Sequence, residues 1–575
     1  MEVFKKQLDV YGDAIILDNY IPADGTYLLV GQDGSIITKQ DIKYDKKTKS
    51  VNLVPFYKQF CFYDYHSSLI DMNKPVDSKK VVHSNSYLSF FIKKDSLVSG
   101  KLDLAAIDRY YNALVNMEEK YKKNKGKELY DTLINEIGEI EISNLEWCRN
   151  WIKQHIFELE QEGVDLSKKD YLKIFFERDD EVYVKEGNRY LVPNLYNSND
   201  YNVLIGDEIY GLPNNNLGMN QKKPYLSSKT RKTPIPYLVT SSAALEQKKF
   251  FDYLLNFAKL GKYNIYVNFN NNKIKAYEND EMPLDEISGY FIRIQKGKEV
   301  EIHNQEVIPF YSNRLSEIFT YKDYVMSTYE EKSRDPAKYG TYNTRSSIHA
   351  IINDVLFSKF LGNNYFTKPE DMSITDGYLK DNLLLARETI FNWAYKGNDY
   401  GMYPVLKRVT LSLIKGSIIK GYNLKAIRQF NLRWSLLNYF SKGEEKMADK
   451  FFSVRERLKE KIMADGSNIL ESDEEYYYAI GQLVSYFISL NKSKNKMQSL
   501  VNPFINAKSN NMLKEKLRQF YKKYNYSIND SNKRFNHLYE MIISYDPDGK
   551  VNQDLIILGY VSDNLIYFKE EKQDE

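Results

Sequence analysis

The side chains that most often carry catalysis are few in this sequence, and their spacing matches none of the common motifs. The six histidines lie at positions 66, 83, 155, 303, 349 and 537. None is followed by aspartate, and no two have the HExxH spacing that puts two ligands on one helix face. The sequence therefore predicts neither an HD-type nuclease nor a zinc protease. The GxxxxGKS/T loop, the GxSxG turn and the GxGxxG turn are also missing from the sequence.

The two cysteines and the acidic residues show no recognisable site either. Cys61 and Cys148 cannot form a CxxC pair, a four-thiolate zinc site or a disulfide framework. The DPDG segment at 546–549 resembles the start of a calcium loop, but its glycine comes too early and no glutamate closes it, so it predicts a turn between helices. We expect no catalytic residue, no metal site and no cofactor. A metal-dependent nuclease stays open as an alternative, because carboxylates from distant strands leave no local motif.

The first of two basic stretches, the 209–245 tract, contains no aspartate or glutamate from Ile209 to Leu245. Its four prolines keep it extended, because proline fixes φ and interrupts helices. Its amides can donate to and accept from base edges, and its cations attract phosphates. A solvated surface loop is the alternative. The candidate nucleic-acid-binding residues here are Asn214, Asn215, Asn216, Gln221, Lys222, Lys223, Lys229, Arg231 and Lys232.

The second stretch, the 492–534 tract, carries a net charge of +9. Placed on short helices, these charges would form a stripe for phosphates. Tyr521, Tyr524 and Tyr526 are interleaved with them and would stack on unpaired bases. The alternative is the solvated face of a helical bundle with its tyrosines packed inward. The candidate nucleic-acid-binding residues here are Lys492, Lys494, Lys496, Lys514, Lys516, Arg518, Lys522 and Lys523.

The composition indicates a globular protein without a strong overall charge. Its 81 Lys+Arg and 78 Asp+Glu give a formal net charge of +3, so only local clusters can indicate a nucleic-acid partner. A length of 575 residues predicts three or four domains at about 150 residues each. The sequence has no apolar run of about 18 residues and no signal peptide at its start, so we expect a cytoplasmic location.

The elements that must position these residues change in type along the chain. Up to residue 343, helical patterns at about 103–125 and 144–161, the second with Ser143 as its N-cap, alternate with β-like runs. The predicted strands are 14–17, 26–30, 50–54, 81–93, 182–184, 264–269 and 290–294. This alternation predicts an α+β (mixed) N-terminal body over residues 1–343.

From residue 344 the apolar residues follow a helical period. Those between Ile348 and Leu356 fall on one helix face, and the same spacing recurs at 480–488, after a capping box formed by Ser472 and Glu475. Further helices are predicted at 381–396, 421–440, 446–463, 511–524, 532–545 and 551–568. The sequence therefore predicts a helical connecting region over 344–446 and an all-α C-terminal helical bundle over 447–575.

Both basic tracts lie in or beside segments that resemble a known family. Over nearly its whole length, the sequence resembles the large subunit of the type I-B CRISPR interference complex (Cascade). None of the matching segments is a catalytic motif, so the resemblance rests on their order and content together. Some relatives carry a cysteine-rich zinc module, which this chain is expected to lack. The segments are LDNYIPADGTY at 17–27, QKKPYLSSKTRKTPIPYLV at 221–239, QKKFFDYL at 247–254, GKYNIYV at 261–267, YAIGQLVSYF at 478–487, VNPFINAK at 501–508 and LGYVSDNLIY at 558–567.

The resemblance implies a non-catalytic subunit of an RNA-guided surveillance complex. Such a subunit recognises a flanking motif (the PAM) in duplex DNA, stabilises the R-loop and recruits a separate helicase-nuclease. Guide pairing then supplies sequence specificity, while the protein reads the flanking motif and backbone shape. The implied partners are the guide RNA, target double-stranded DNA, the Cascade backbone and guide-end-binding subunits, small helical subunits and the helicase-nuclease. A stand-alone RNA- or DNA-binding scaffold is the alternative.

The resemblance also implies that the C-terminal bundle is made separately as a small subunit by internal translation. Residues 442–444 (Lys-Gly-Glu) can be encoded by AAAGGAGAA, which contains a ribosome-binding core, and two codons then separate them from Met447. Met463 is the second possible start, although it would remove most of the preceding predicted helix. The alternative is that these residues are a polar turn between two helices.

Overall fold

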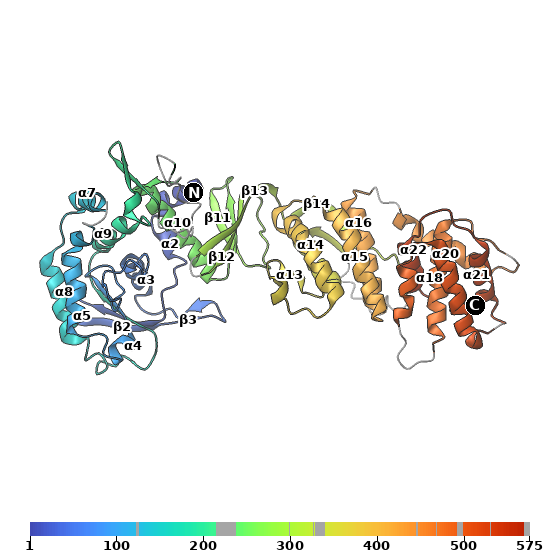
Figure 1. The fold of residues 1–575 in the computed structure, drawn as a ribbon, viewed down its shortest axis with the longest axis horizontal. Coiled ribbons are helices and arrows are strands. Elements are labelled where there is room, and N and C mark those ends of the chain that lie inside the picture. Colours follow the sequence, from blue (N-terminus) through green and yellow to red (C-terminus); the bar gives the residue numbers. More distant parts are fainter. Residues whose placement is uncertain are drawn as a thin grey trace, which may run out of the picture. The chain divides into compact units, whose positions relative to one another are not determined.

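The structure of the chain is a computed structural model with two compact units. It describes residues 1–121, 126–213, 230, 237–297, 300–325, 327, 340–443, 447–466, 468–491, 498–529 and 531–568. The first unit comprises Met1–Glu278 and Gly289–Val307, and the second comprises Asn279–Ser288 and Ile308–Glu575. The last strand ends at Thr344, and the described residues after it form helices and their connections (Figure 1). This confirms the predicted fold class, an α+β body followed by a helical C-terminal part.

A four-stranded sheet forms the centre of the first unit, with the strand order β2-β1-β6-β5. The strands β1 (Gly25–Val30) and β2 (Ile36–Ile42) form an antiparallel hairpin. Next to them, β6 (Tyr171–Phe176) runs parallel to β1, and β5 (Ser89–Lys93) runs antiparallel to β6. All six residues of β1 are buried, because helices cover both faces of the sheet.

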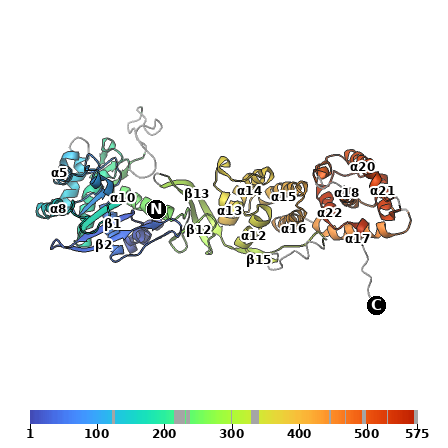
Figure 2. The ribbon, with the colours of Figure 1, turned by 90° about the horizontal axis from the view of Figure 1, so that it is seen from below.

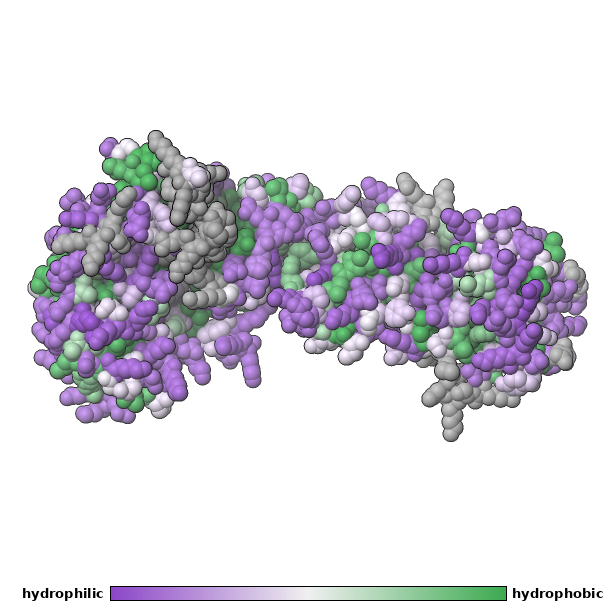
Figure 3. Space-filling view, viewed as in Figure 1, coloured by the Kyte–Doolittle hydropathy of each residue, from purple (hydrophilic) through white to green (hydrophobic). Residues whose placement is uncertain are grey.

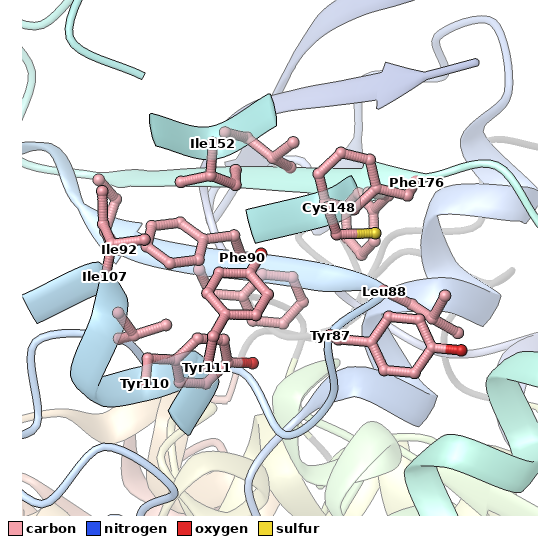
Figure 4. Packing of buried hydrophobic residues seen from close by; sticks show 14 of the residues in the cluster. Tyr87, Leu88, Phe90, Ile92, Ile107, Tyr110, Tyr111, Cys148, Ile152 and Phe176 are labelled. Carbon is pink, nitrogen blue, oxygen red and sulfur yellow. The ribbon is translucent and has the colours of Figure 1, made fainter. Parts of the chain in front are cut away.

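Aromatic residues fill the space between this sheet and its helices. On one face, α5 (Leu104–Val115) and α8 (Ile142–His155) pack against β5 and β6, as Figure 4 shows. Phe90 lies parallel to Tyr111 with ring centroids 6.3 Å apart. On the other face, Tyr63 of α3 (Tyr57–Ser67) stacks on Tyr183 of α9 (Asp180–Leu191) at 3.8 Å.

A second sheet follows, with the order β11-β10-β12-β13. One face is covered by α1 (Glu2–Tyr11) and α10 (Ser241–Lys259), which share a core with its strands. Its strands are β10 (Asn264–Asn268), β11 (Lys273–Tyr277), β12 (Ile287–Lys296) and β13 (Val300–Tyr311). The strands of the smaller sheets are β3 (Tyr44–Asp45) with β4 (Ser50–Val51), β7 (Val203–Ile205) with β8 (Glu208–Gly211) and β9 (Val239–Thr240), and β14 (Arg314–Thr320) with β15 (Thr341–Thr344). The remaining helices of the first unit are α2 (Ala14–Leu17), α4 (Lys94–Val98), α6 (Met117–Tyr121) and α7 (Lys127–Ile137).

Helices build the second unit almost entirely, and both predicted helical regions contribute to it. A buried ion pair joins the two regions: the Arg433 Nε donates to Asp554 Oδ1 at 2.9 Å, and the Arg433 side chain is only 1% exposed. The helices are α12 (Arg345–Ile351), α13 (Leu361–Asn364), α14 (Gly377–Lys396), α15 (Met402–Ile419), α16 (Asn423–Phe440), α17 (Phe451–Met463), α18 (Asp473–Ser489), α19 (Asn502–Ile505), α20 (Asn510–Tyr524), α21 (Lys533–Ser544) and α22 (Gln553–Val561). None of the helices in the described residues is long and apolar enough to cross a membrane.

Two of the resembling segments meet where α18 crosses α22. A Cβ added at Gly481 of α18 would lie 2.2 Å from the carbonyl oxygen of Ile556. Likewise, a Cβ added at Gly559 of α22 would lie 2.1 Å from the carbonyl oxygen of Tyr478. Only glycine leaves room for two helix backbones at this distance. The glycines of YAIGQLVSYF and LGYVSDNLIY therefore allow the backbones of α18 and α22 to approach each other closely.

Several local predictions are confirmed. The apolar residues predicted to share a helix face, from Ile348 to Leu356, are all buried, and they lie on α12 and on the π-helical turn Ile352–Leu356 that continues it. The N-cap of α12 is Thr344, whose hydroxyl accepts from Ser347 N at 3.3 Å. Ser472 caps α18 by accepting from Glu475 N at 3.3 Å. The Glu475 carboxylate accepts from Glu471 N and, on α17, from Arg457 and Lys461. Burial raises the pKa of Glu475, but these donors together bring it below its usual value.

Other local predictions were wrong. Residues 14–17 form α2 rather than a strand, and residues 182–184 lie inside α9. In α9, Tyr183 and Tyr190 are buried seven residues apart, and this helical spacing outweighs the local strand preference of Val-Tyr-Val. Ser143 lies within α8, whose N-cap is Glu141. Helix α15 was not predicted.

Candidate nucleic-acid interface

Helix α20 carries the five described candidate residues of the 492–534 tract, Lys514, Lys516, Arg518, Lys522 and Lys523. Four apolar residues anchor it: Leu513, Leu517, Phe520 and Tyr524 are buried at helical spacing. The Phe520 ring meets Phe504 of α19 at 5.0 Å and Phe487 of α18 at 6.2 Å between centroids. Figure 2 shows α20 beside α18. The glycine-mediated crossing of α18 and α22 therefore supports the helix that presents the basic residues.

The opposite face of α20 is basic. The helix carries five cations and one acid, Glu515, which gives it a net charge of +4. Lys514, Arg518 and Lys522 are spaced four residues apart and therefore form one row along the helix. Lys516 and Lys523 are seven apart and form a second row on the other side of Gln519. The sequence predicts one stripe of basic side chains, whereas the basic side chains of α20 form two rows.

The five cations differ in exposure and in their contacts with other side chains of the protein. Lys514 is the least available, because its side chain is 13% exposed and its Nζ lies 2.5 Å from Asp546 Oδ1. This contact holds the pKa of Asp546 below its usual value. Lys516 is half-buried and donates to Gln519 Oε1 at 3.0 Å. Arg518 lies 3.9 Å from Glu515, and the Arg518 side chain is 56% exposed.

The two remaining cations, Lys522 and Lys523, lie at the C-terminal end of α20 and are exposed. Lys523 Nζ lies 5.3 Å from the ring centroid of Tyr524. Within the part of the chain that the structure describes, no carboxylate forms an ion pair with either ammonium group. The strongest candidates for phosphate contact are therefore Lys522 and Lys523. Lys516, which donates to an amide oxygen, and Arg518, whose ion pair with Glu515 is exposed and weak, come next.

The three tyrosines of the tract have different positions. Tyr524 is a core residue, 2% exposed and stacked on Phe487, so the prediction that it stacks on bases is wrong. Tyr521 is 37% exposed and lies over Tyr539, with ring centroids 4.9 Å apart. Tyr526 is 69% exposed. A base can therefore reach Tyr526, or extend the existing stack at Tyr521.

The other predicted site residues lie outside the described residues. They comprise the whole candidate set of the 209–245 tract and the first part of the 492–534 tract. These residues are Asn214, Asn215, Asn216, Gln221, Lys222, Lys223, Lys229, Arg231, Lys232, Lys492, Lys494 and Lys496.

Both cysteines and His349 are buried, and the His66 side chain is only 9% exposed. Burial raises the pKa of Cys61 to about 11 and raises that of Cys148 further, so both thiols are protonated at neutral pH. Burial likewise lowers the pKa of His66 and of His349 to about 4, so both rings are neutral there. Among the described residues, no group of three or more His, Cys, Asp or Glu side chains is arranged to hold a metal ion.

The buried His349 predicts a pH dependence of stability. Because its pKa is about 4 in the folded protein and about 6.5 when unfolded, the unfolded chain binds more protons between these values. The free energy of unfolding of the second unit should therefore fall from pH 6.5 to 4, by up to about 1.4 kcal/mol per pH unit. Denaturant titrations at several pH values measure this slope. We expect His349→Gln to flatten this slope, and an unchanged slope in that variant would contradict the prediction.

A third group of basic residues was not singled out from the sequence. Lys43, Lys46, Lys47 and Lys49 lie on or beside the hairpin of β3 and β4, and all four are exposed. Four lysines in seven residues, KYDKKTK, were the available signal. It was weak because lysine is abundant throughout this chain.

Comparisons with known protein families, with curated proteins and with solved structures found no match to this chain.

Proposed function

We propose that this protein is the non-catalytic large subunit of a type I-B CRISPR surveillance complex, and that it acts in the cytoplasm. In this role it recognises the PAM in duplex DNA, stabilises the R-loop and recruits a separate helicase-nuclease. Its partners are the guide RNA, the target DNA, the Cascade backbone and guide-end-binding subunits, and small helical subunits. The sequence resemblance supports this assignment, and α20 is the structural observation that carries it.

The exposed cations of α20 suit a phosphate backbone better than a specific base. Lysine ammonium groups on flexible stems bind phosphates as point charges, whereas base recognition needs fixed donors and acceptors. Tyr526 is exposed, and Tyr521, which stacks on Tyr539, immediately precedes Lys522 in the sequence. The surface therefore combines positive charge with aromatic rings. This combination is typical of sites that bind single strands without sequence preference. We therefore assign α20 to the unpaired DNA strand of the R-loop.

A four-residue variant tests this assignment. Changing Lys516, Arg518, Lys522 and Lys523 to alanine should weaken binding of the full chain to DNA with an internal unpaired bubble at least tenfold in 0.1 M salt. It should also reduce the slope of log Kobs against log salt by about 0.7 for each lost single-strand contact. Binding to fully paired DNA should change less, because α20 is assigned to the unpaired strand.

The matched control removes four exposed cations from other elements of the same unit. It changes Lys322, Lys368, Arg408 and Lys550 to alanine. Equal losses in the two variants, or equal losses on bubble and paired DNA, would show a general charge effect and contradict the assignment of α20.

Copurification distinguishes the surveillance complex from a stand-alone scaffold. We expect the tagged protein, expressed with the genes beside its own, to copurify with a guide RNA of uniform length and with several other subunits. A protein that binds nucleic acid but copurifies without such an RNA would be the scaffold. Metal-dependent DNA cleavage by the isolated chain would instead identify a nuclease.

A further inference from the structure

The hairpin of β3 and β4 presents lysines on a short two-stranded ribbon. In Figure 1 it projects to the right from the lower half of the first unit, near the label β3, and Figure 3 colours the same region hydrophilic. Its strands pair through Tyr44 with Val51 and Asp45 with Ser50, and residues 46–49 form the turn. The ribbon therefore ends in a turn with the sequence Lys-Lys-Thr-Lys.

Hydrogen bonds hold the base of this hairpin in place. The Asn52 side chain accepts from Lys43 N at 2.7 Å and donates to Asp41 O at 2.7 Å. Asp24 Oδ1 accepts from Tyr44 N at 2.8 Å, and the Tyr44 hydroxyl donates to Lys259 O at 3.3 Å. These contacts fix the direction of the ribbon, so its lysines are displayed with little loss of backbone freedom on binding.

Acidic groups at the hairpin do not cancel its charge. Asp45 Oδ1 accepts from Lys47 N at 2.7 Å, and this backbone hydrogen bond holds the pKa of Asp45 below its usual value. Lys49 pairs with Glu278. Throughout the described ranges, no carboxylate lies within ion-pair distance of the side chains of Lys43, Lys46 or Lys47. By contrast, the nearby Lys168 pairs with Asp41 at 3.2 Å.

We infer that this hairpin is a second DNA-binding surface that enters the major groove of B-form duplex DNA and contacts the flanking phosphates. A two-stranded ribbon fits that groove, which is about 12 Å wide. The major groove of A-form RNA is too narrow and deep for side chains to read. The inference rests on the proposed nucleic-acid function and adds to it a contact with paired DNA, separate from α20.

The test compares two matched variants of the full chain. The hairpin variant changes Lys43, Lys46 and Lys47 to alanine, and the control variant changes the exposed Lys58, Lys79 and Lys101 to alanine. Binding to a 30-base-pair DNA duplex and to an RNA duplex of the same sequence is measured across salt concentrations. We expect the hairpin variant to lose at least tenfold in DNA affinity and about 0.9 in salt slope per contact, with a smaller loss on RNA. Replacing the three lysines with arginine should preserve DNA binding.

Each other outcome overturns the inference. Equal losses in the hairpin and control variants, or equal losses on DNA and RNA, would show that the hairpin has no groove-specific role. If those results came with the expected effect of the α20 variant on bubble DNA, the proposed function would still hold. A wild-type chain that binds neither DNA duplex nor bubble DNA would overturn both.

Discussion

Replacing Asp554 with asparagine is expected to lower the free energy of unfolding of the second unit by about 3–5 kcal/mol. The Asp554 carboxylate accepts from Arg433 Nε at 2.9 Å and from Nη2 at 3.1 Å. In the Asp554→Asn variant, the Arg433 guanidinium would stay buried with no counter-charge. It would still donate to Lys407 O and Thr410 Oγ1. Denaturant titration, combined with hydrogen exchange of α16 and α22, measures the loss.

The same substitution at an exposed aspartate provides the control. Asp546 is 95% exposed and also pairs with a lysine, so Asp546→Asn should lower the stability by no more than about 1 kcal/mol. Replacing both Arg433 and Asp554 with apolar residues should recover part of the loss, because a buried ion pair contributes little compared with well-packed apolar groups. An effect of Asp554→Asn no larger than that of Asp546→Asn would show that the pair is unimportant.

This ion pair bears on the proposed internal start at Met447. A chain that begins there contains Asp554 but lacks Arg433 and the rest of α16. Its α22 would expose the surface that contacts α16 in the full chain. We therefore expect a small subunit made from Met447 to be less stable alone than the same residues are in the full chain, and to need a partner surface that replaces α16.

Replacing Gly481 with valine is the second substitution with a large expected effect, about 3 kcal/mol of stability lost from the second unit. The added side chain cannot fit, because its Cβ would lie 2.2 Å from Ile556 O and 2.6 Å from Tyr560 N, both backbone atoms. Helices α18 and α22 must move apart, which opens the core that α20 shares with α18. Thermal unfolding of the purified variant measures the loss.

A glycine at a helix start without close neighbours provides the comparison. Gly377 is the first residue of α14, and a Cβ added there would meet nothing within 4 Å. Gly377→Val should therefore change the melting temperature far less than Gly481→Val. Similar shifts in both would mean that the cost is helix propensity rather than the contact between α18 and α22.

Local features of the fold were predictable from the sequence, and contacts between distant residues were not. The helix face from Ile348 to Leu356 and the cap at Ser472 follow from spacing within one turn or two. The wrong prediction of a strand at residues 182–184 has a different cause, which is contact with residues distant in the sequence. There, the burial of Tyr183 and Tyr190 against other elements decides between helix and strand, and no local pattern contains those partners.

In the candidate interface too, local features were predictable from the sequence and contacts with distant residues were not. The positive charge of α20 was predictable, because net charge in a short segment can be read directly from the sequence. The engagement of Lys514 was not, since its partner Asp546 lies 32 residues away. Tyr524 was wrongly predicted to stack on bases because its buried position depends on Phe487 of another helix. For the hairpin lysines, the missing information was the ribbon geometry rather than the charge.

The second unit is discontinuous in the chain, because Asn279–Ser288 belongs to it while Gly289–Val307 belongs to the first. The Tyr311 hydroxyl donates to Pro283 O at 3.1 Å, so this short segment contributes to the structure of the second unit. An expression fragment that starts at residue 308 would lack it and leave that hydroxyl without its acceptor. Conversely, a nick at the 307–308 junction should yield two pieces that remain associated on a sizing column until denaturant is added. Cloning either unit by itself therefore requires grafting or deleting the 279–288 segment.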